Sequence, residues 1–158
     1  MAQAISGFNV QMADTVMILH ARQHWITVSA TTNNITYVDS LRPHQPLSQY
    51  VIRQLLNLFP QHVGDDGKLR LSIVPSTPQT NGEDCGVFAA AYATELVCAD
   101  GAPGLLAPFE VASMRAHLER CLQQQELTPF PRTTTRRTRQ LQKVINVAVD
   151  EQGVDVLL

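Results

Sequence analysis

The stretch QTNGEDCGVFAAAYATEL, from Gln79 to Leu96, decides how the rest of the chain is interpreted. Its Asn-Gly pair predicts a sharp turn, and the apolar, Ala-rich run from Val87 to Val97 predicts a helix buried on most sides. Glu95 is the one residue of this run that we expect to face water. Cys85 therefore stands at the start of a rigid, buried helix.

This position of Cys85 suits a nucleophile. At a helix N-terminus, unpaired backbone N–H groups and the positive end of the helix dipole favour a thiolate over a thiol. Gly86 leaves the next position without a side chain, so a substrate can approach the sulfur closely. A free cysteine is nevertheless most often a small buried hydrophobe. The catalytic interpretation therefore depends on which groups the fold brings to Cys85.

Composition limits the class of protein. With 158 residues, 44% of them hydrophobic, the chain is long enough for one domain with a core. It has no apolar run of the ~20 residues that a membrane span needs, and its start lacks the pattern of a signal peptide. We therefore expect an intracellular protein of the nucleus or cytoplasm, without a membrane partner. The three cysteines have no CxxC spacing and predict neither a disulfide framework nor a four-cysteine zinc site.

The charge is unevenly distributed along the chain. Residues 1–130 carry 7 basic and 11 acidic side chains, whereas residues 131–158 carry 5 and 3. The segment PRTTTRRTR, Pro131 to Arg139, has no apolar periodicity, which predicts a solvated linker or arm. The arginines at 132–139 could contact nucleic acid. Arginines without aromatic neighbours, however, more often belong to a soluble tail. We expect one N-terminally short domain over 1–130, and over 131–158 the basic arm with a fragment of a following segment.

Strand patterns precede the central helix. TVMILH, HWITVSA and NITYVDS are rich in β-branched and aromatic residues, which predicts a three-stranded antiparallel meander over residues 15–40. LRLSIVP, at 69–75, predicts a fourth strand that leads into the cysteine stretch. The end of the chain, VINVAVDEQGVDVLL, also alternates like a strand.

Two amphipathic helices complete the pattern. SQYVIRQLLNLFP has apolar residues at helical spacing, with Ser48 as its cap and Pro60 as its stop. EVASMRAHLERCL predicts a second such helix with Met114 and Cys121 on its apolar side, together with Val111 and Leu118. The expected fold class is α+β, with a small antiparallel sheet packed against the buried helix that carries Cys85 at its N-terminus.

The strand order supplies the partners that a cysteine nucleophile needs: a base, a group that orients the base, and donors for the oxyanion. His24 opens the second strand and Asp39 closes the third, so antiparallel pairing makes them neighbours. Gln79 can point its amide N–H at the oxyanion beside the backbone N–H of Cys85. Taken singly, a surface histidine and a turn-capping aspartate are the commoner roles of His24 and Asp39.

These residues carry a family resemblance. The order HW at His24-Trp25, YVDSL around Asp39 and QTNGEDCGVF from Gln79 to Phe88 resembles the ubiquitin-like-modifier cysteine proteases, the family of the SUMO-specific (sentrin-specific) proteases. The resemblance covers about Val16 to Leu96. The segment MRAHLERCLQQQELTPFP is similar to the divergent, transposon-associated branch of that family.

The resemblance implies a papain-like cysteine protease that cuts peptide or isopeptide bonds after the C-terminal glycine of a ubiquitin-like modifier such as SUMO. It implies His24 as general base, Asp39 as its orienter, Gln79 as oxyanion donor and Cys85 as nucleophile. It also implies that Trp25 lines a narrow tunnel for the Gly-Gly tail of the modifier. The expected partners are ubiquitin-like modifiers and their conjugates, and no metal or organic cofactor is implied.

Two other interpretations stay open. The first is a binding module of protease descent that grips a ubiquitin-like modifier without cutting it; the complete set of four catalytic residue types argues against it. The second is a metal site using His20 and His24, which are four residues apart as helical zinc ligands are. Their flanks are strand-like and no third ligand is evident, which argues against zinc.

Overall fold

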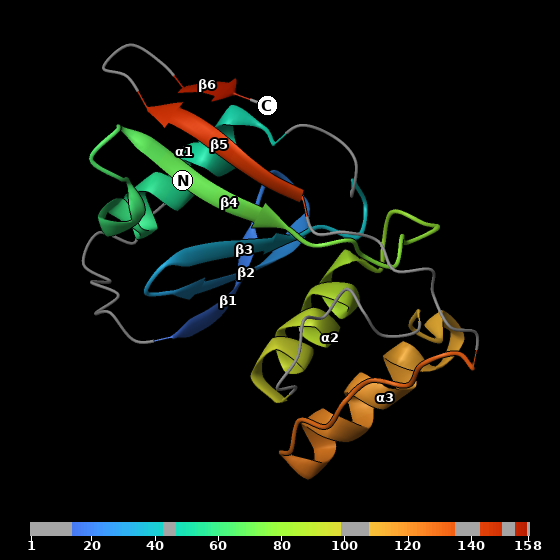
Figure 1. Ribbon diagram of the computed structural model, residues 1–158. Helices are drawn as coiled ribbons and strands as arrows, with labels where there is room; N and C mark the ends of the chain where they lie inside the picture. Colours follow the sequence, from blue (N-terminus) through green and yellow to red (C-terminus); the bar gives the residue numbers. More distant parts are fainter. Residues whose placement is uncertain (1–13, 43–46, 99–107, 135–142, 150–153, 158) are drawn as a thin grey trace.

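The computed structural model describes residues 14–42, 47–98, 108–134, 143–149 and 154–157. Within these ranges the chain has a mixed α+β fold, built on one sheet with helices packed against it (Figure 1). In chain order the elements are β1 (Thr15–His20), β2 (Trp25–Thr31), β3 (Asn34–Val38), α1 (Gln49–Leu58), the 3₁₀ turn η1 (Pro60–His62), β4 (Lys68–Ile73), α2 (Cys85–Cys98), α3 (Val111–Gln124), β5 (Lys143–Val149) and β6 (Val154–Leu157).

The strands lie side by side in their chain order, from β1 to β6. Every neighbouring pair is antiparallel except β3 and β4, which run parallel. A parallel pair needs a long crossover connection, and α1 with η1 forms it. The antiparallel meander of the first three strands and the fourth strand, all predicted from sequence, are confirmed.

The hairpin between β1 and β2 has a tight turn over Ala21–His24. His20 pairs with Trp25, and the backbone N–H of Ala21 donates to the carbonyl oxygen of His24 at 2.7 Å. Arg22 and Gln23 at the centre of the turn have φ of 48° and 64°. A two-residue turn with positive φ at both positions matches the right-handed twist of the strands, but it is normally occupied by Asn and Gly. The turn places His24 directly at the start of β2.

Helix α1 packs on one face of the sheet. Ser48 Oγ accepts a hydrogen bond from the Val51 backbone N–H at 3.3 Å, and the helix ends at Leu58, ahead of Pro60, as the sequence predicted. Its apolar side meets alternate residues of β2, β3 and β4. The buried cluster on this face includes Ile26, Val28, Ala30, Ile35, Val51, Ile52, Leu55, Phe59, Leu69 and Leu71.

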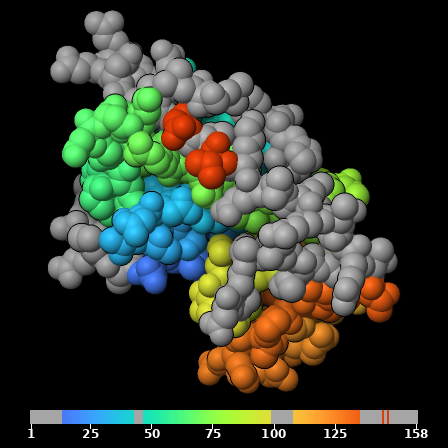
Figure 2. Space-filling model, viewed as in Figure 1, coloured from blue at the N-terminus to red at the C-terminus, as the bar shows by residue number. Residues whose placement is uncertain are grey.

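Helix α2 packs on the opposite face. Thr27 lies between Ile26 and Val28 on β2, so its side chain points away from α1, and its Oγ1 donates to the carbonyl oxygen of Ala89 at 2.8 Å. Helix α3 packs against α2, and the two helices form the yellow and orange layer on this side of the sheet in Figure 2. The cluster here contains Val38, Val74, Val87, Phe88, Ala91, Tyr92, Phe109, Met114 and Phe130, and Leu118 and Val111 pack at its margin.

The expectation that Glu95 faces water is wrong. Its side chain is 5% exposed and forms an ion pair with Arg132, whose guanidinium lies 4.3 Å from the centre of the Phe109 ring. Helix α2 is therefore covered on the side that carries its one charged residue. The cover comes from the first residues of the segment that the sequence predicted as a solvated arm.

The start of the predicted arm is fixed by backbone hydrogen bonds, and the chain beyond the arm contributes a strand to the sheet. The Glu110 backbone N–H donates to Pro131 O at 2.9 Å, and the Thr133 N–H donates to Pro108 O at 2.8 Å. Farther on, β5 pairs with β4 along Lys68–Ile73. Residues 135–142, which hold the other three arginines of the predicted arm, lie outside the described residues. Arg132 differs from the expected solvated arginine because it is held between Glu95 and Phe109.

Candidate active site

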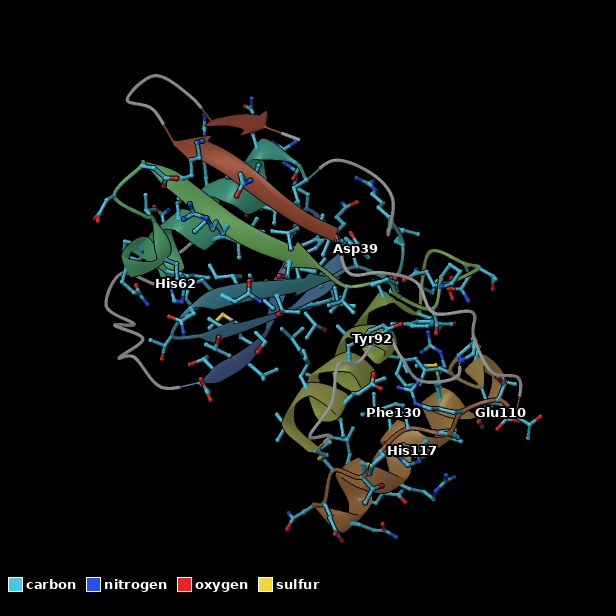
Figure 3. All side chains as sticks on the ribbon, in the orientation of Figure 1. Asp39, His62, Tyr92, Glu110, His117 and Phe130 are labelled. Atoms are coloured by element: carbon cyan, nitrogen blue, oxygen red, sulfur yellow. The ribbon has the colours of Figure 1, made fainter. Side chains whose placement is uncertain are left out.

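His24 and Asp39 meet where the β1–β2 turn and the end of β3 come together. His24 Nε2 lies 2.7 Å from Asp39 Oδ1, and both side chains are buried. The last registered pair of β2 and β3 is Thr27 with Val38, so the next residue of β3 lies beside the start of β2. The strand order therefore made these two residues neighbours, as predicted. Figure 3 labels Asp39 at this end of β3, on the side where α2 begins.

Asp39 is held as an acceptor from several directions. Its Oδ1 accepts from the backbone N–H groups of Leu41 at 2.8 Å and Arg42 at 3.0 Å, and its Oδ2 accepts from the Tyr37 hydroxyl at 3.0 Å. Burial, together with the nearby Asp39 carboxylate, raises the pKa of Tyr37 well above its usual value, so this hydroxyl stays a donor. These hydrogen bonds fix the orientation of the Asp39 carboxylate.

The carboxylate in turn decides which imidazole nitrogen is free. Because Asp39 accepts at Nε2, the neutral ring of His24 carries its proton there and leaves Nδ1 with a lone pair. His24 Nδ1 is buried and has no hydrogen-bond partner among the described residues. The ring is thus arranged as a base whose accepting nitrogen is unused.

Cys85 is the first residue of α2, and the residue is 7% exposed. The Phe88 N–H donates to Asp84 O at 2.9 Å, so the first helical turn closes on the residue before the cysteine. A Cβ added at Gly86 would lie 3.5 Å from Trp25 Cδ1. Trp25 follows His24 in the chain, so the start of α2 stands against the start of β2, and Cys85 and His24 belong to the same end of the molecule.

The contact between sulfur and imidazole is open in this structure. His24 Nδ1 makes no hydrogen bond to Cys85 Sγ or to any other described atom. Such bonds between catalytic groups are often long without substrate and shorten when substrate binds. Beside His24 and Asp39, on the α1 side, lies a pocket of about 280 Å³ whose lining includes Arg22, Arg42 and Tyr50.

Gln79 is oriented by the loop that follows β4. Its backbone N–H donates to Ser40 O at 2.9 Å, and its side-chain Oε1 accepts from Ser40 Oγ at 2.7 Å. Its Nε2 donates to Asn81 O at 2.6 Å, which leaves the second hydrogen of the amide for another acceptor. The oxyanion donor expected from sequence is therefore buried and fixed at both ends, between the residue after Asp39 and the turn before Cys85.

The turn before Cys85 is built by a side chain, not by glycine. Asn81 Oδ1 accepts from the N–H groups of Glu83 at 2.9 Å and Asp84 at 3.0 Å. Gly82 does not have a positive φ, and a Cβ there would meet nothing within 4 Å. The sequence predicted a sharp turn from the Asn-Gly pair; the structure assigns it to the Asn81 amide.

Sequence reasoning missed the residue that secures this turn from α3. Arg115 Nε donates to Asp84 Oδ1 at 2.7 Å, a guanidinium nitrogen lies 2.5 Å from the same oxygen, and a further bond reaches Glu83 O at 3.2 Å. Asp84 Oδ2 accepts from Asn81 Nδ2 at 2.6 Å. Nothing in the helical pattern of 111–124 separates Arg115 from an ordinary surface arginine, so no local signal could have found it.

His20 and His24, the pair considered as metal ligands from sequence, do not come together on a common site. The His20 ring packs on Trp25 with centroids 4.7 Å apart, while His24 is bound to Asp39, so the two imidazoles have separate partners. In the part of the chain that the structure describes, no three His, Cys, Asp or Glu side chains come together as metal ligands. None of the described helices has the length and apolar character that a membrane crossing needs.

Comparisons of the chain with protein-family models, with curated proteins and with solved structures found no match in any of the three.

Proposed function

We propose that this protein is a cysteine peptidase of the papain-like class that hydrolyses the peptide or isopeptide bond after the C-terminal glycine of a ubiquitin-like modifier such as SUMO. One observation carries the proposal. A buried histidine has Nε2 on a carboxylate and Nδ1 unpartnered, at the same end of the molecule as a buried cysteine on the first turn of a helix. This arrangement combines the nucleophile, base and orienting group of thiol peptidases.

The chemistry follows from these positions. Cys85 gives its proton to His24 Nδ1, and its sulfur attacks the carbonyl carbon of the terminal glycine. The negative charge on the carbonyl oxygen is stabilised by the free amide hydrogen of Gln79 and by the backbone N–H of Cys85. His24 then protonates the leaving amine, and the C–N bond breaks to leave a thioester on Cys85. A water molecule, deprotonated by His24, attacks the thioester, and the tail leaves as a carboxylate while the sulfur recovers its proton.

The choice of glycine is supported by the surface next to the nucleophile. Trp25 is 42% exposed, and its indole lies beside Gly86, where an added Cβ would be 3.5 Å from Cδ1. We infer that this exposed indole contacts the extended tail of the modifier beside the start of α2. The modifier class itself comes from the family resemblance of the motifs around His24, Asp39 and Cys85.

A second candidate is a binding module that holds the modifier on the same surface without cutting it. The observation that favours it is the missing hydrogen bond between Cys85 and His24 among the described residues. Both candidates predict modifier binding and differ only in turnover.

A panel of modifiers with electrophilic C-termini tests the proposal. Ubiquitin, SUMO and other modifiers carrying such a group are incubated with the protein and with Cys85→Ala, and covalent adducts are detected by mass spectrometry. A single modifier class should form an adduct on Cys85, and its fluorogenic conjugate should be turned over. Binding without adduct or turnover would replace the peptidase by the binding module, and no reaction with any modifier would overturn the assigned substrate.

A further inference from the structure

We propose that Arg115 of α3 is a positioning residue for the nucleophile: it neutralises the Asp84 carboxylate so that the neighbouring Cys85 can ionise. This inference rests on the proposed function, because it concerns how that reaction's nucleophile is prepared. It assigns a role to an exposed arginine that is 30 residues from Cys85 in the sequence and belongs to no recognised motif.

The problem that Arg115 solves is electrostatic. Asp84 immediately precedes Cys85, and its side chain is 13% exposed, so its charge is only partly screened by water. A carboxylate next to a thiol opposes the formation of a thiolate, because like charges repel. The N–H groups at a helix N-terminus generally favour a thiolate, and an uncompensated carboxylate at Asp84 would act against them.

Arg115 offsets this charge by contacting the Asp84 carboxylate with two of its guanidinium nitrogens. Its Nε and a terminal nitrogen both reach Asp84 Oδ1, at 2.7 and 2.5 Å, and the guanidinium also donates to Glu83 O. The other carboxylate oxygen of Asp84 accepts from Asn81 Nδ2. Both oxygens of Asp84 are therefore occupied, and the turn that ends at the nucleophile is tied to α3.

The same contacts continue toward the oxyanion donor. Gln79 Nε2 donates to Asn81 O, and Ser40 Oγ donates to Gln79 Oε1. A line of hydrogen bonds thus runs from the residue after Asp39, through Gln79 and the turn, to Arg115. Among the described residues, the charged and titratable groups that these hydrogen bonds bring to this end of α2 include His24, Asp39 and Tyr37 from the sheet, Glu83 and Asp84 from the turn, and Arg115 from α3.

Alkylation of Cys85 tests the role of Arg115 without any substrate. Cys98 is exposed and would also react, so the measurements are made in a Cys98→Ser background. The rate of iodoacetamide labelling of Cys85 is followed by mass spectrometry from about pH 5 to pH 10. Arg115→Gln should label about three- to tenfold more slowly on the acidic side of the profile, the size expected for one uncompensated neighbouring charge near the surface. It should match the parent near pH 10, where thiols are ionised.

Two further variants separate charge from structural support. Asp84→Asn/Arg115→Gln removes the carboxylate as well and should restore labelling to within about twofold of the parent, although it lacks both partners of the ion pair. Arg120→Gln removes an exposed arginine from the same helix and should change nothing. Unchanged labelling in Arg115→Gln would overturn the inference. Slowing at every pH that the double variant does not restore would also overturn it, since that pattern means that Arg115 only supports the fold.

Failure of this inference is distinct from failure of the proposed function. If Cys85 of the parent protein reacts no faster than an ordinary thiol, the peptidase proposal fails. If Cys85 is fast but indifferent to Arg115, only the positioning role is lost.

Discussion

Replacement of Glu95 by Gln should make the protein more stable at neutral pH, although it breaks an ion pair. Burial raises the pKa of Glu95 from its usual 4.5 to about 7, and the attraction of Arg132 offsets only part of this rise. The free-energy cost of removing the carboxylate from water therefore exceeds the stabilisation that Arg132 provides. Glutamine keeps the shape of the side chain and carries no charge at any pH.

The sign and size follow from proton linkage. Between about pH 4.5 and 7 the folded protein keeps a proton on Glu95 that the unfolded chain has released, so the free energy of unfolding falls as the pH rises through this window. The contribution is fully present below pH 4.5 and lost above about pH 7. At about 1.4 kcal/mol for each tenfold change in proton affinity, the loss is about 3 kcal/mol.

Urea unfolding of the parent and Glu95→Gln at intervals from pH 4.5 to 8 measures this difference. The two proteins should be about equally stable at the acidic end, and the variant should gain about 3 kcal/mol over the parent by pH 7.5. Glu126→Gln, at an exposed position after α3, is the matched control and should follow the parent throughout. A parent that is more stable than Glu95→Gln at pH 7.5 would refute the reasoning, since the ion pair would then outweigh the burial of its charge.

Three other predictions follow from the described contacts. Cys85→Ala should abolish turnover of the modifier substrate, while Gln79→Ala should lose about 10²- to 10³-fold in kcat, the usual cost of one oxyanion donor; equal rates for Gln79→Ala and the parent would remove Gln79 from the mechanism. Replacing Arg22-Gln23 in the turn by Asn-Gly should raise the free energy of unfolding by about 1 kcal/mol, because both positions have positive φ. A lower melting temperature in this variant than in the parent would contradict the prediction. Deleting residues 132–158 removes the partner of Glu95 and exposes the β5 side of β4, so the melting temperature should fall; an unchanged melting temperature would restore the solvated-arm interpretation.

The local elements could be predicted because their signals are local. The alternation of apolar residues gave β1 to β4, and the serine cap and proline stop bounded α1 at Ser48 and Pro60. The apolar run after Cys85 predicted that the residue stands at the start of a buried helix. Chain order alone also made His24 and Asp39 neighbours, since in an antiparallel hairpin the start of one strand lies beside the end of the other.

The partners of the site could not be predicted in the same way. Arg115 reaches Asp84 from a different helix, and Ser40 orients Gln79 across 39 residues of chain. Gly82 carried a turn signal that the structure does not use, because the Asn81 amide already satisfies the backbone of the turn. Contacts of this kind depend on how the helices pack against the sheet. The sequence around Arg115 or Ser40 does not differ from that around a residue whose side chain faces water.

The sequence by itself determined the elements, the place of Cys85 on α2 and the pairing of His24 with Asp39. All of these depend on periodicities and turns within a few residues, or on the geometry of adjacent strands. Only the tertiary structure decided that Glu95 is buried against Arg132, that Arg115 pairs with the Asp84 carboxylate next to Cys85, and that β5 continues the sheet along β4. Whether a charged side chain meets water or a partner depends on which distant segment covers it, and that is settled by the packing of the whole fold, not by the neighbours of the residue in the chain.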